Sequence, residues 1–564
     1  MGAAQRGAEG CAKGAVVNQS TLTKKSELEC LVLGHYDLGF DFHEGLQRSR
    51  GLNSGEYRNL RMDFITLDGK KLPYLNVLNE LTGQRLHWTE MTQVAPVYLA
   101  SFLTSQGISA EFSSFFHTQR DELNELFSRR PKVIAITTTL YLTPLVAKEV
   151  VKFVREKSPD SFIVVGGPLI DNLAYHLDEA DFRIILEDIG GDVYVQQKQG
   201  EQTLANLLMK LRESGDLSKV KNCYIKWNGQ FVFTGAEAEF SLAPINWSNF
   251  HNKDLGQTLQ TRTALSCPFR CTFCDYPVRA GKWVPQEISQ VENELRQIQE
   301  RSNVTNLVFI DDTFNVPADR FKEILRMMIR NQFTFRWYSY LRCNIMDEEL
   351  CDLMARSNCG GVFLGIESGD PDVLKIMKKV ATPEQYVRGM KFLNASGIMT
   401  FASLIVGFPG ETSKTVDNTI QLLQDAGPTF FRGEIWYNNP RAPIYSKSKD
   451  VHGINGFGYK WRHNTMDWEQ GCEEVMKLFR SVSNSTWLPM YDFDFWILPY
   501  LEGKGMSMDQ IKRFVNSCDD LLSLEINEPR GGKRITDRQL AENNLRQVCS
   551  EIERNSFAVA AAAS

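Results

Sequence analysis

Short apolar runs alternate with helical segments along most of this chain, and this alternation constrains the fold more than any other feature. In the first series, strands are expected at 28–34, 108–112, 132–138, 162–165 and 182–185. Helices are expected at 97–106, 121–129, 144–157 and 173–179, and another opens at Gly200-Glu201 and runs to Leu211. Such a series predicts a parallel, doubly wound, Rossmann-like sheet, whose ligand lies at the carboxyl ends of the strands.

A long insertion, residues 35–92, separates the first strand from this regular pattern. We expect no clear helix in it and one hairpin at Asp68-Gly69. Insertions of this length are uncommon and are often functional. A second hairpin is expected at 222–233, around Asn228-Gly229, and residues 234–258 are expected to form a linker.

A second alternating series begins near Thr261. Its expected strands are 261–265, 307–310, 336–340, 362–366 and 400–406, with helices between them. This pattern predicts a (β/α) barrel or partial barrel of about six strands, in which the chemistry lies at the C-terminal strand ends. After about residue 430 the alternation fades into an aromatic-rich stretch, followed by a helix at 508–521.

Composition excludes several classes of protein. Twelve cysteines in 564 residues are too few for a disulfide framework, and the eight histidines show no metal-binding spacing. The formal net charge of −6 disfavours a nucleic-acid clamp. No run of about 18 apolar residues is present, so no membrane span is expected. Residues 1–27 lack an apolar signal core and are expected to be a disordered lead-in, which favours a cytoplasmic protein.

Three cysteines stand apart from the nine scattered ones. Cys267, Cys271 and Cys274 form a CxxxCxxC motif directly after an expected barrel strand. Three thiolates this close in sequence can bind three irons of a [4Fe–4S] cluster and leave the fourth iron open for a ligand. The alternative, a zinc site, usually requires four closed ligands.

This motif, with Phe273 directly before its third cysteine, resembles the radical S-adenosylmethionine (SAM) superfamily, and the resemblance extends over about residues 260–425. It implies that the open iron of the cluster binds SAM. The residues that it places around SAM are Phe273, Asp311, Asp312, Arg342, Glu367, Ser368 and Gly407. Simpler readings remain open: Asp311-Asp312 as a helix N-cap, Glu367 as a surface residue, and Gly407 as a turn glycine.

Residues 97–215 resemble the cobalamin-binding domain that precedes the barrel in one radical SAM class. The resemblance implies cobalamin contacts from Thr137, Thr138, Thr139, Gly166, Gly167, Gly200 and Glu201. No Asp-x-His-x-x-Gly motif occurs, so no histidine obviously serves as lower ligand. The resemblance implies that cobalamin is bound base-off, without a histidine ligand. The alternatives are a sheet that only docks the barrel and a nucleotide site, although no GxGxxG follows Leu33.

The expected architecture is therefore α/β: a Rossmann-like cobalamin-binding domain, a partial (β/α)6 radical SAM barrel and an α-rich C-terminal domain. The expected boundaries are 1–27 for the lead-in, 28–233 for the cobalamin-binding domain with its insertion 35–92, 234–258 for the linker, 259–428 for the barrel, 429–555 for a C-terminal substrate or capping domain, and 556–564 for the tail.

Residues 436–443 and 456–466 are similar to the tail of cobalamin radical SAM methylases of natural-product pathways, including phosphinate P-methylases and tryptophan C-methylases. The resemblance implies methylation of an unactivated carbon or phosphorus in a natural-product or peptide-type substrate. It implies flavodoxin or ferredoxin as electron donor, and neither nucleic acid nor a membrane as partner.

The sequence leaves three alternative functions to consider. The first is a cobalamin-dependent radical SAM cyclase or rearrangement enzyme without net methyl transfer, which the sequence barely separates from a methylase. A tRNA methylthiotransferase would need three further N-terminal cluster cysteines and a basic tail. A non-catalytic cobalamin or iron–sulfur sensor would need a DNA- or partner-binding module, and no such module is recognisable in the sequence.

Overall fold

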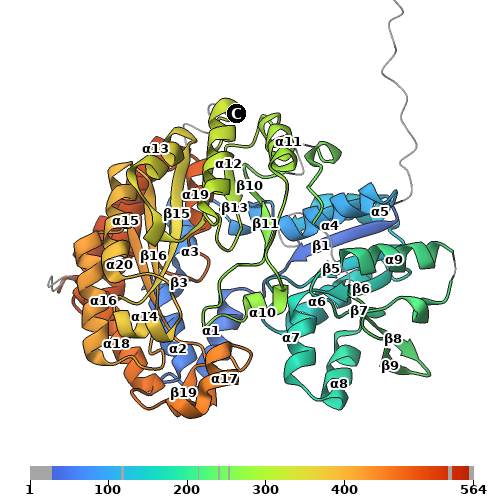
Figure 1. Cartoon of the computed structure of the whole chain (residues 1–564), viewed down its shortest axis with the longest axis horizontal. Helices are drawn as coiled ribbons and strands as arrows, with labels where there is room; N and C mark the ends of the chain where they lie inside the picture. Colours follow the sequence, from blue (N-terminus) through green and yellow to red (C-terminus); the bar gives the residue numbers. More distant parts are fainter. Residues whose placement is uncertain are drawn as a thin grey trace, which may run out of the picture.

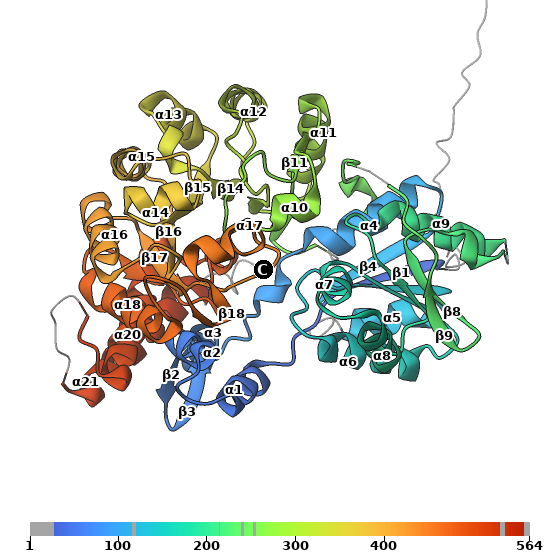
Figure 2. The ribbon, with the colours of Figure 1, turned by 60° about the horizontal axis from the view of Figure 1, so that its bottom comes forward.

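The chain forms two lobes, each built round a seven-stranded sheet (Figure 1). The structure is a computed structural model and describes residues 28–115, 120–213, 215–238, 242–251, 255–530 and 536–557. The expected lead-in, 1–27, and most of the expected tail lie outside the described residues. Figure 2 shows the two lobes from a second direction, with α17 at their junction.

The first sheet has the doubly wound topology that the sequence predicts. In spatial order its strands are β4 (Ala110–Phe115), β1 (Cys30–His35), β5 (Val133–Thr137), β6 (Phe162–Gly166), β7 (Val193–Val195), β8 (Cys223–Trp227) and β9 (Gln230–Phe233). The first five are parallel, and β8 and β9 form the expected antiparallel hairpin at Asn228-Gly229. The strand order reverses between β1 and β5, so the topological switch point lies there.

Helices cover both faces of this sheet. Cys30 and Val32 of β1 point into one core, with α4 (Val94–Ser105) and α9 (Glu201–Arg212). Leu31 and Leu33 point into the other core, which α5 (Arg120–Ser128), α6 (Pro144–Lys157), α7 (Pro168–His176) and α8 (Glu179–Ile189) enclose. Strands that are buried on both faces explain why the sequence shows continuous apolar runs rather than alternation.

The expected strand at 182–185 is wrong, because these residues lie in α8. Asp178 caps that helix by accepting a hydrogen bond from the Asp181 amide, and Phe182, Leu186 and Ile189 form its buried face. Their spacing of four and three residues is helical. The strand that pairs with β6 is β7, which begins eight residues after the expected strand ends.

The insertion is more regular than expected. The hairpin at Asp68-Gly69 is confirmed as β2 (Phe64–Leu67) with β3 (Lys70–Pro73). The expectation of no helix is wrong, because α1 (Phe40–Ser49), α2 (Gly55–Leu60) and α3 (Tyr74–Thr82) lie within it. These helices are short, and α3 is stabilised by burial of Tyr74, Val77 and Leu78 in the core of the second lobe.

The second sheet is an open, fully parallel half-barrel. In spatial order its strands are β10 (Thr258–Thr261), β13 (Asn306–Phe309), β14 (Arg336–Leu341), β15 (Cys359–Glu367), β16 (Met399–Val406), β17 (Phe430–Ile435) and β20 (Thr486–Trp487). The expected strand at 261–265 is split, since β11 (Ala264–Leu265) leaves the sheet to pair with β12 (Val284–Pro285). The domain boundaries remain predictions; β17 begins at Phe430, inside the segment assigned to the C-terminal domain.

Helices surround the outer side of the half-barrel (Figure 1). They are α11 (Ile288–Gln299), α12 (Ala318–Arg330), α13 (Glu348–Arg356), α14 (Pro371–Ile376), α15 (Pro383–Ala395), α16 (Ser413–Ala426) and α18 (Trp468–Ser481). The short helix α10 (Tyr276–Ala280) lies instead at the junction of the lobes. The C-terminal part adds α17 (Pro443–His452), the hairpin β18 (Asn455–Phe457) with β19 (Lys460–Arg462), α19 (Ile497–Gly503), α20 (Met508–Ile526) and α21 (Arg538–Ile552). None of the described helices is long and apolar enough to cross a membrane.

The insertion packs against both edges of the half-barrel. At one edge, Thr92 forms a parallel bridge with Leu259 of β10. At the other, Asp63 Oδ1 lies 2.8 Å from Arg432 Nη1 of β17, and Arg432 is fully buried. Arg432 also contacts Glu434, and its guanidinium lies 4.6 Å from the ring centroid of Trp487. The insertion therefore contacts the first strand of the sheet, β10, and the strand β17, which lies next to the edge strand β20.

The segment between the sheets is anchored, although it was expected to be a linker. Glu294 of α11 is buried and accepts hydrogen bonds from the Ile245 amide, the Trp247 indole and the Thr261 hydroxyl. Burial raises the pKa of Glu294 to about 7, although these hydrogen bonds act in the opposite direction. One carboxyl group thus connects the segment to the first strand of the half-barrel.

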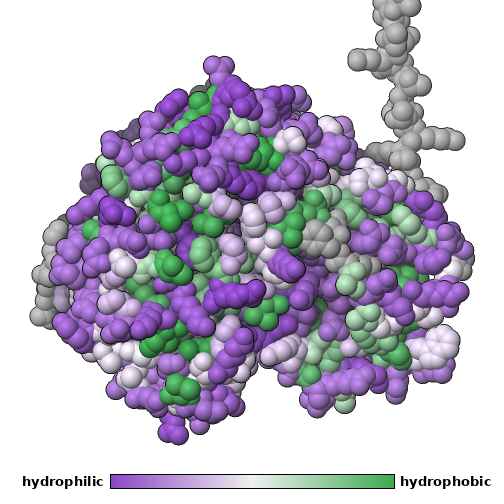
Figure 3. All heavy atoms as spheres, in the orientation of Figure 1, coloured by the Kyte–Doolittle hydropathy of each residue, from purple (hydrophilic) through white to green (hydrophobic). Residues whose placement is uncertain are grey.

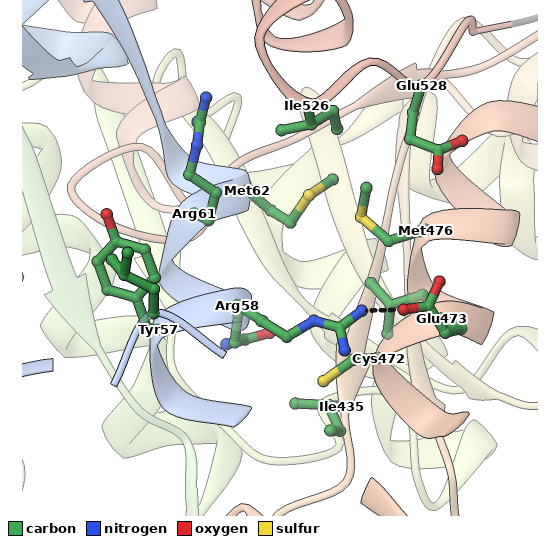
Figure 4. A pocket seen from close by; sticks show the side chains of 13 residues that line it. Tyr57, Arg58, Arg61, Met62, Ile435, Cys472, Glu473, Met476, Ile526 and Glu528 are labelled. Atoms are coloured by element: carbon green, nitrogen blue, oxygen red, sulfur yellow. Dashed lines mark hydrogen bonds and ion pairs between the residues drawn. The ribbon is translucent and has the colours of Figure 1, made fainter. Parts of the chain in front are cut away.

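The surface is mostly hydrophilic and is hollowed between the lobes (Figure 3). A separate cavity of about 250 Å³ lies between the insertion and the C-terminal part. In Figure 4, Arg58 of α2 reaches across it to Glu473 of α18, beside the apolar side chains of Met62, Met476 and Ile526. This ion pair adds a polar contact between the insertion and the outer helices.

Replacing Arg432 by methionine should lower the free energy of unfolding by about 3–5 kcal/mol, because Asp63 would keep a buried charge without its partner. A Lys148→Met variant is the control, since its ion pair with Asp188 is exposed and is worth less than about 1 kcal/mol. Urea titrations followed by tryptophan fluorescence give the free energy of unfolding of each variant. Equal losses in the two variants would contradict the structural role of the Asp63–Arg432 pair.

The stability of the chain should depend on pH through Glu294. Between pH 4.5 and about 7 the folded chain holds this proton while the unfolded chain has released it. The contribution of Glu294 to the free energy of unfolding is therefore fully present at low pH. It falls by about 3 kcal/mol as pH rises through that window. A Glu294→Gln variant should show a flatter dependence in urea titrations at several pH values, and an unchanged slope would refute this assignment.

Candidate active site between the two lobes

The cysteine motif forms a loop that is held from both sides. It begins after β11 at Ser266, whose φ of +66° turns the chain sharply and whose hydroxyl donates to the Gly281 carbonyl at 2.8 Å. At its centre, Thr272 donates to the carbonyls of Met377 (3.0 Å) and Ile376 (2.8 Å) and accepts from the Ile444 amide (2.8 Å). The loop is thus fixed between α14 and α17.

The three loop cysteines differ from the other described cysteines in exposure. Cys267, Cys271 and Cys274 are partly exposed free thiols, whereas the other eight described cysteines are buried. Burial raises the pKa of Cys271, and the nearby cations Lys379 and Arg342 act in the opposite direction. In the described part of the chain, no three His, Cys, Asp or Glu side chains are placed to hold a single metal ion. Three accessible thiols with cations beside them suit a cluster of several irons.

Asp311 and Asp312 follow β13, beside this loop. Asp311 is buried and accepts from the Thr263 amide (2.9 Å) and hydroxyl (2.8 Å). Both of its oxygens are therefore occupied in fixing the segment that leads into the cysteine loop. Asp312 is exposed and lies beside the Tyr276 hydroxyl. Of the two, only Asp312 is available to a ligand.

Arg342 is placed to receive an anion. Asn315 brackets its backbone, accepting from the Arg342 amide (3.0 Å) and donating to its carbonyl (2.8 Å). The guanidinium lies 3.7 Å from the ring centroid of Phe269, inside the cysteine motif. Its buried Nη2 has no hydrogen-bond partner among the described residues. A buried donor without a partner carries a large desolvation penalty, which an anionic ligand would remove.

Glu367 stands at the end of β15 in a strained conformation. Its φ is +66°, and the pairing of β15 with β16 shifts register beside it. Such backbone strain often marks a functional position. Glu367 Oε1 lies 3.0 Å from Lys379 Nζ, which also donates to the Gly365 carbonyl and lies 5.8 Å from the ring of Phe273. Lys379 was not expected here, since nothing in the sequence links it to Glu367.

The two remaining expected SAM residues have structural roles. Ser368 is fully buried, and its hydroxyl accepts from the Asp370 amide at 3.2 Å. Gly407 has φ +86°, and a Cβ there would lie 2.5 Å from the ring of Trp461. Its carbonyl lies 3.0 Å from His463 Nε2, and Glu411 accepts from its amide. Gly407 is therefore required by packing as well as by its turn.

A cavity of about 330 Å³ lies between the lobes, at the carboxyl ends of β5, β6 and β7. Thr137, Thr139, Gly166, Gly167, Gly200 and Glu201 line it, so the structure brings six of the seven expected residues together. Thr138 does not line it; its hydroxyl donates to the Gly166 carbonyl (2.9 Å) and accepts from the Leu169 amide (3.2 Å). The half-barrel supplies the opposite wall, including Arg262, Tyr276 and Arg279.

The glycines of this wall are required by close packing. Gly167 has φ +112°, and a Cβ there would lie 2.9 Å from Thr138 Oγ1. At Gly200 a Cβ would lie 3.1 Å from the Val195 side chain. Side chains at these positions would press on the strand ends that shape the cavity. At these glycines the wall is backbone alone, which a large ligand can approach closely.

Polar side chains complete the cavity. Tyr98 donates to Glu201 Oε1 at 3.1 Å, and the Arg262 guanidinium lies 4.4 Å from the ring centroid of Tyr98. Among the described residues that line the cavity none is a histidine. His35, at the carboxyl end of β1, is buried against Trp88, with a ring separation of 4.7 Å.

A known family model matches most of the half-barrel, including the cysteine loop. Residues 263–423 match the model of the Radical SAM superfamily, so the chain carries a radical SAM domain. An uncharacterised methyltransferase of Pyrococcus horikoshii is 26% identical over 303 residues, covering 52% of this chain and 63% of that protein. An anaerobic magnesium-protoporphyrin IX monomethyl ester cyclase of Cereibacter sphaeroides is 25% identical over 354 residues, covering 58% of this chain and 55% of that one.

A solved structure extends the likeness to the whole fold. The radical SAM methyltransferase TsrM from Kitasatospora setae, with tryptophan substrate and a SAM analogue bound, has a TM-score of 0.55 at 17% identity. The match covers 94% of this chain and 99% of that one. Another structure of TsrM holds cobalamin and a [4Fe–4S] cluster. The chain thus has the two-lobed fold of this enzyme, whereas its match spans less than two thirds of the length of the two curated relatives.

The exposure of the thiols can be tested without any cofactor. When the cluster-free chain is alkylated briefly with iodoacetamide, Cys267, Cys271 and Cys274 should react before the eight buried cysteines, because reagent must reach the sulfur. Peptide mass mapping gives the order. Reconstitution with iron and sulfide should then protect these three, and equal labelling of buried cysteines such as Cys343 and Cys518 would contradict the loop geometry.

Proposed function

We propose that this chain is a cobalamin-dependent radical SAM methyltransferase. One observation supports it above the others: the cavity at the strand ends of the first sheet is closed by residues of the half-barrel that flank the cysteine loop. A ligand in the cavity would therefore lie beside a ligand of the cluster. Among the relatives, a tryptophan 2-C-methyltransferase and a bacteriochlorophyllide methyltransferase are named for methyl transfer.

The residues present fit the two metal cofactors. Cys267, Cys271 and Cys274 would hold three irons of a [4Fe–4S] cluster, and the glycine-lined wall with Thr137, Thr139 and Glu201 would hold cobalamin. We propose the base-off form without a histidine ligand, as the resemblance implies; none of the described residues that line the cavity is a histidine. When bound, SAM on the open iron supplies a radical that removes hydrogen from an unactivated substrate position, and cobalamin supplies the methyl group.

The side chains of this chain would orient SAM by charge. Arg342 is the candidate partner of the SAM carboxylate, because its Nη2 is buried without a partner among the described residues. The Glu367–Lys379 pair would fix the edge of the same site, where Lys379 also lies over Phe273. Asp312 and Tyr276 stand between the cysteine loop and the cavity. Asp312, Arg342 and Glu367 lie at or just after the ends of β13, β14 and β15. Positions fixed in this way hold reacting atoms in a productive geometry, which contributes to the rate.

The substrate would enter between the lobes, where water must be excluded during radical chemistry. We propose a natural-product or peptide-type small molecule, methylated at carbon or phosphorus, and an external flavodoxin or ferredoxin as electron donor. A second candidate is ring formation without methyl transfer. It is favoured by one observation, the likeness to a magnesium-protoporphyrin monomethyl ester cyclase over 354 residues.

Anaerobic reconstitution with iron, sulfide and hydroxocobalamin tests the proposal. The intact chain should show iron–sulfur absorption together with tightly bound base-off cobalamin. The Cys267/Cys271/Cys274→Ala variant should lose the cluster and keep the cobalamin, because the cavity does not depend on the thiols. Incubation with methyl-labelled SAM and candidate substrates should then give a labelled product.

Three results would contradict the proposal at different points. The absence of any cluster in the intact chain would refute the assignment of the cysteine loop. A cluster without bound cobalamin would indicate that the first sheet only docks against the half-barrel. An isomerised or cyclised product without label would favour the second candidate.

A further inference from the structure

One arginine links the wall of the cavity to the cysteine loop. Arg441 precedes α17, and its Nη1 lies 2.9 Å from Asp171 Oδ2 and 3.1 Å from Asn172 Oδ1, both in α7 of the first lobe. Its guanidinium lies 4.2 Å from the ring centroid of Tyr175. A single side chain of the other lobe thus contacts three residues of α7 that lie within about one helical turn.

Both ends of this contact belong to the proposed site. Asp171 lines the cavity, and α7 begins at Pro168, directly after Gly167. On the other side, the Ile444 amide donates to the Thr272 carbonyl, in the centre of the cysteine loop, only three residues after Arg441. The series of contacts from Asp171 through Arg441 and Ile444 to Thr272 therefore connects the two proposed cofactor sites.

This ion pair is stronger than an ordinary surface pair. The side chains of Arg441 and Asp171 are 13% and 21% exposed, so water screens them little. Two charge-assisted hydrogen bonds and a ring contact act on one guanidinium, which exposed pairs seldom combine. A packing contact between His176 of α7 and Phe457 of β18 lies nearby, with ring centroids 6.1 Å apart.

We propose that Arg441 is a positioning residue that holds α7 against the half-barrel and so retains cobalamin at a fixed separation from the cluster. This inference rests on the proposed function. Without Arg441, α7 would lose its ion pair with the half-barrel and keep the weaker ring contact between His176 and Phe457, and the cavity wall that it carries would be free to move outward. Cobalamin would then leave more readily, while the cluster would be unaffected because Thr272 keeps its contacts with α14.

The test compares Arg441→Gln and Arg441→Lys with the unaltered chain. The matched control is Arg129→Gln, whose arginine is 15% exposed and pairs with Glu111 at 2.9 Å, within the first lobe. Hydroxocobalamin dissociation is followed by absorbance after dilution, and hydrogen exchange is measured over residues 168–176 in the cobalamin-free chain. Cluster absorbance is recorded for each variant.

We expect Arg441→Gln to release hydroxocobalamin about 10-fold faster, as the loss of a charged hydrogen bond predicts. Arg441→Lys should show a smaller effect, because it keeps the charge and loses the stacking of the planar guanidinium on Tyr175. Exchange over 168–176 should rise in Arg441→Gln only, and cluster absorbance should not change. Dissociation and exchange equal to those of Arg129→Gln would overturn the inference.

The two proposals fail in different ways. If the unaltered chain binds no hydroxocobalamin, the proposed function is wrong, whereas the exchange measurement still tests whether Arg441 holds α7. If cobalamin binds tightly and Arg441→Gln releases it at the unaltered rate, the proposed function stands and the role of Arg441 is refuted.

Discussion

The site depends on one constraint, the direction of the strands in two parallel sheets. Parallel strands all end at the same edge, so their carboxyl ends gather polar loops there. In this chain the carboxyl edges of the two sheets are brought together: Thr137 and Gly166 line the cavity from one side, and Arg262 and Ile310 from the other. Neither lobe alone encloses the cavity, because each contributes only one wall.

Buried carboxyl and guanidinium groups connect the segments of the chain that surround this arrangement. Asp63 and Arg432 connect the insertion to β17, and Glu294 connects the segment between the sheets to β10. Buried ionic groups are costly unless they are paired, so the surrounding packing must keep each partner in place. At the site itself, Nη2 of Arg342 is buried without a hydrogen-bond partner among the described residues, and an anionic ligand would supply one.

Much of the fold could be predicted, because parallel sheets leave a strong trace in sequence. Both sheets, both hairpins and the cysteine loop follow from apolar runs, turn residues and spacing. The strand expected at 182–185 failed because an apolar run of four residues fits either element, and the Asp178 cap decides for a helix. The helices of the insertion were missed because burial of Tyr74 and Val77 in the other lobe, rather than local propensity, stabilises α3.

The candidate site was predictable where residues adjoin a strand end, and less so where side chains meet across the fold. Six of seven expected residues line the cavity, whereas Thr138 points into the turn behind it. Asp311 lies at the expected edge, but Thr263 occupies its oxygens. Lys379 and Arg441 could not be found from sequence, since their partners are 12 and 270 residues away. Only the folded chain brings these pairs together.

The path of the insertion has a consequence for how the chain can be divided. It leaves the first lobe at His35, packs along the second lobe, and returns to the first through α4. A cut between residues 233 and 259 would separate the sheets in sequence and yet leave residues 40–92 on the wrong fragment. The half-barrel would then lack the insertion that packs against β10 and β17. In the other fragment, Tyr74, Val77 and Leu78 would be exposed to water. The two lobes are therefore one unit for expression and assembly. If two halves were produced separately, residues 40–92 would have to be part of the fragment that contains the half-barrel.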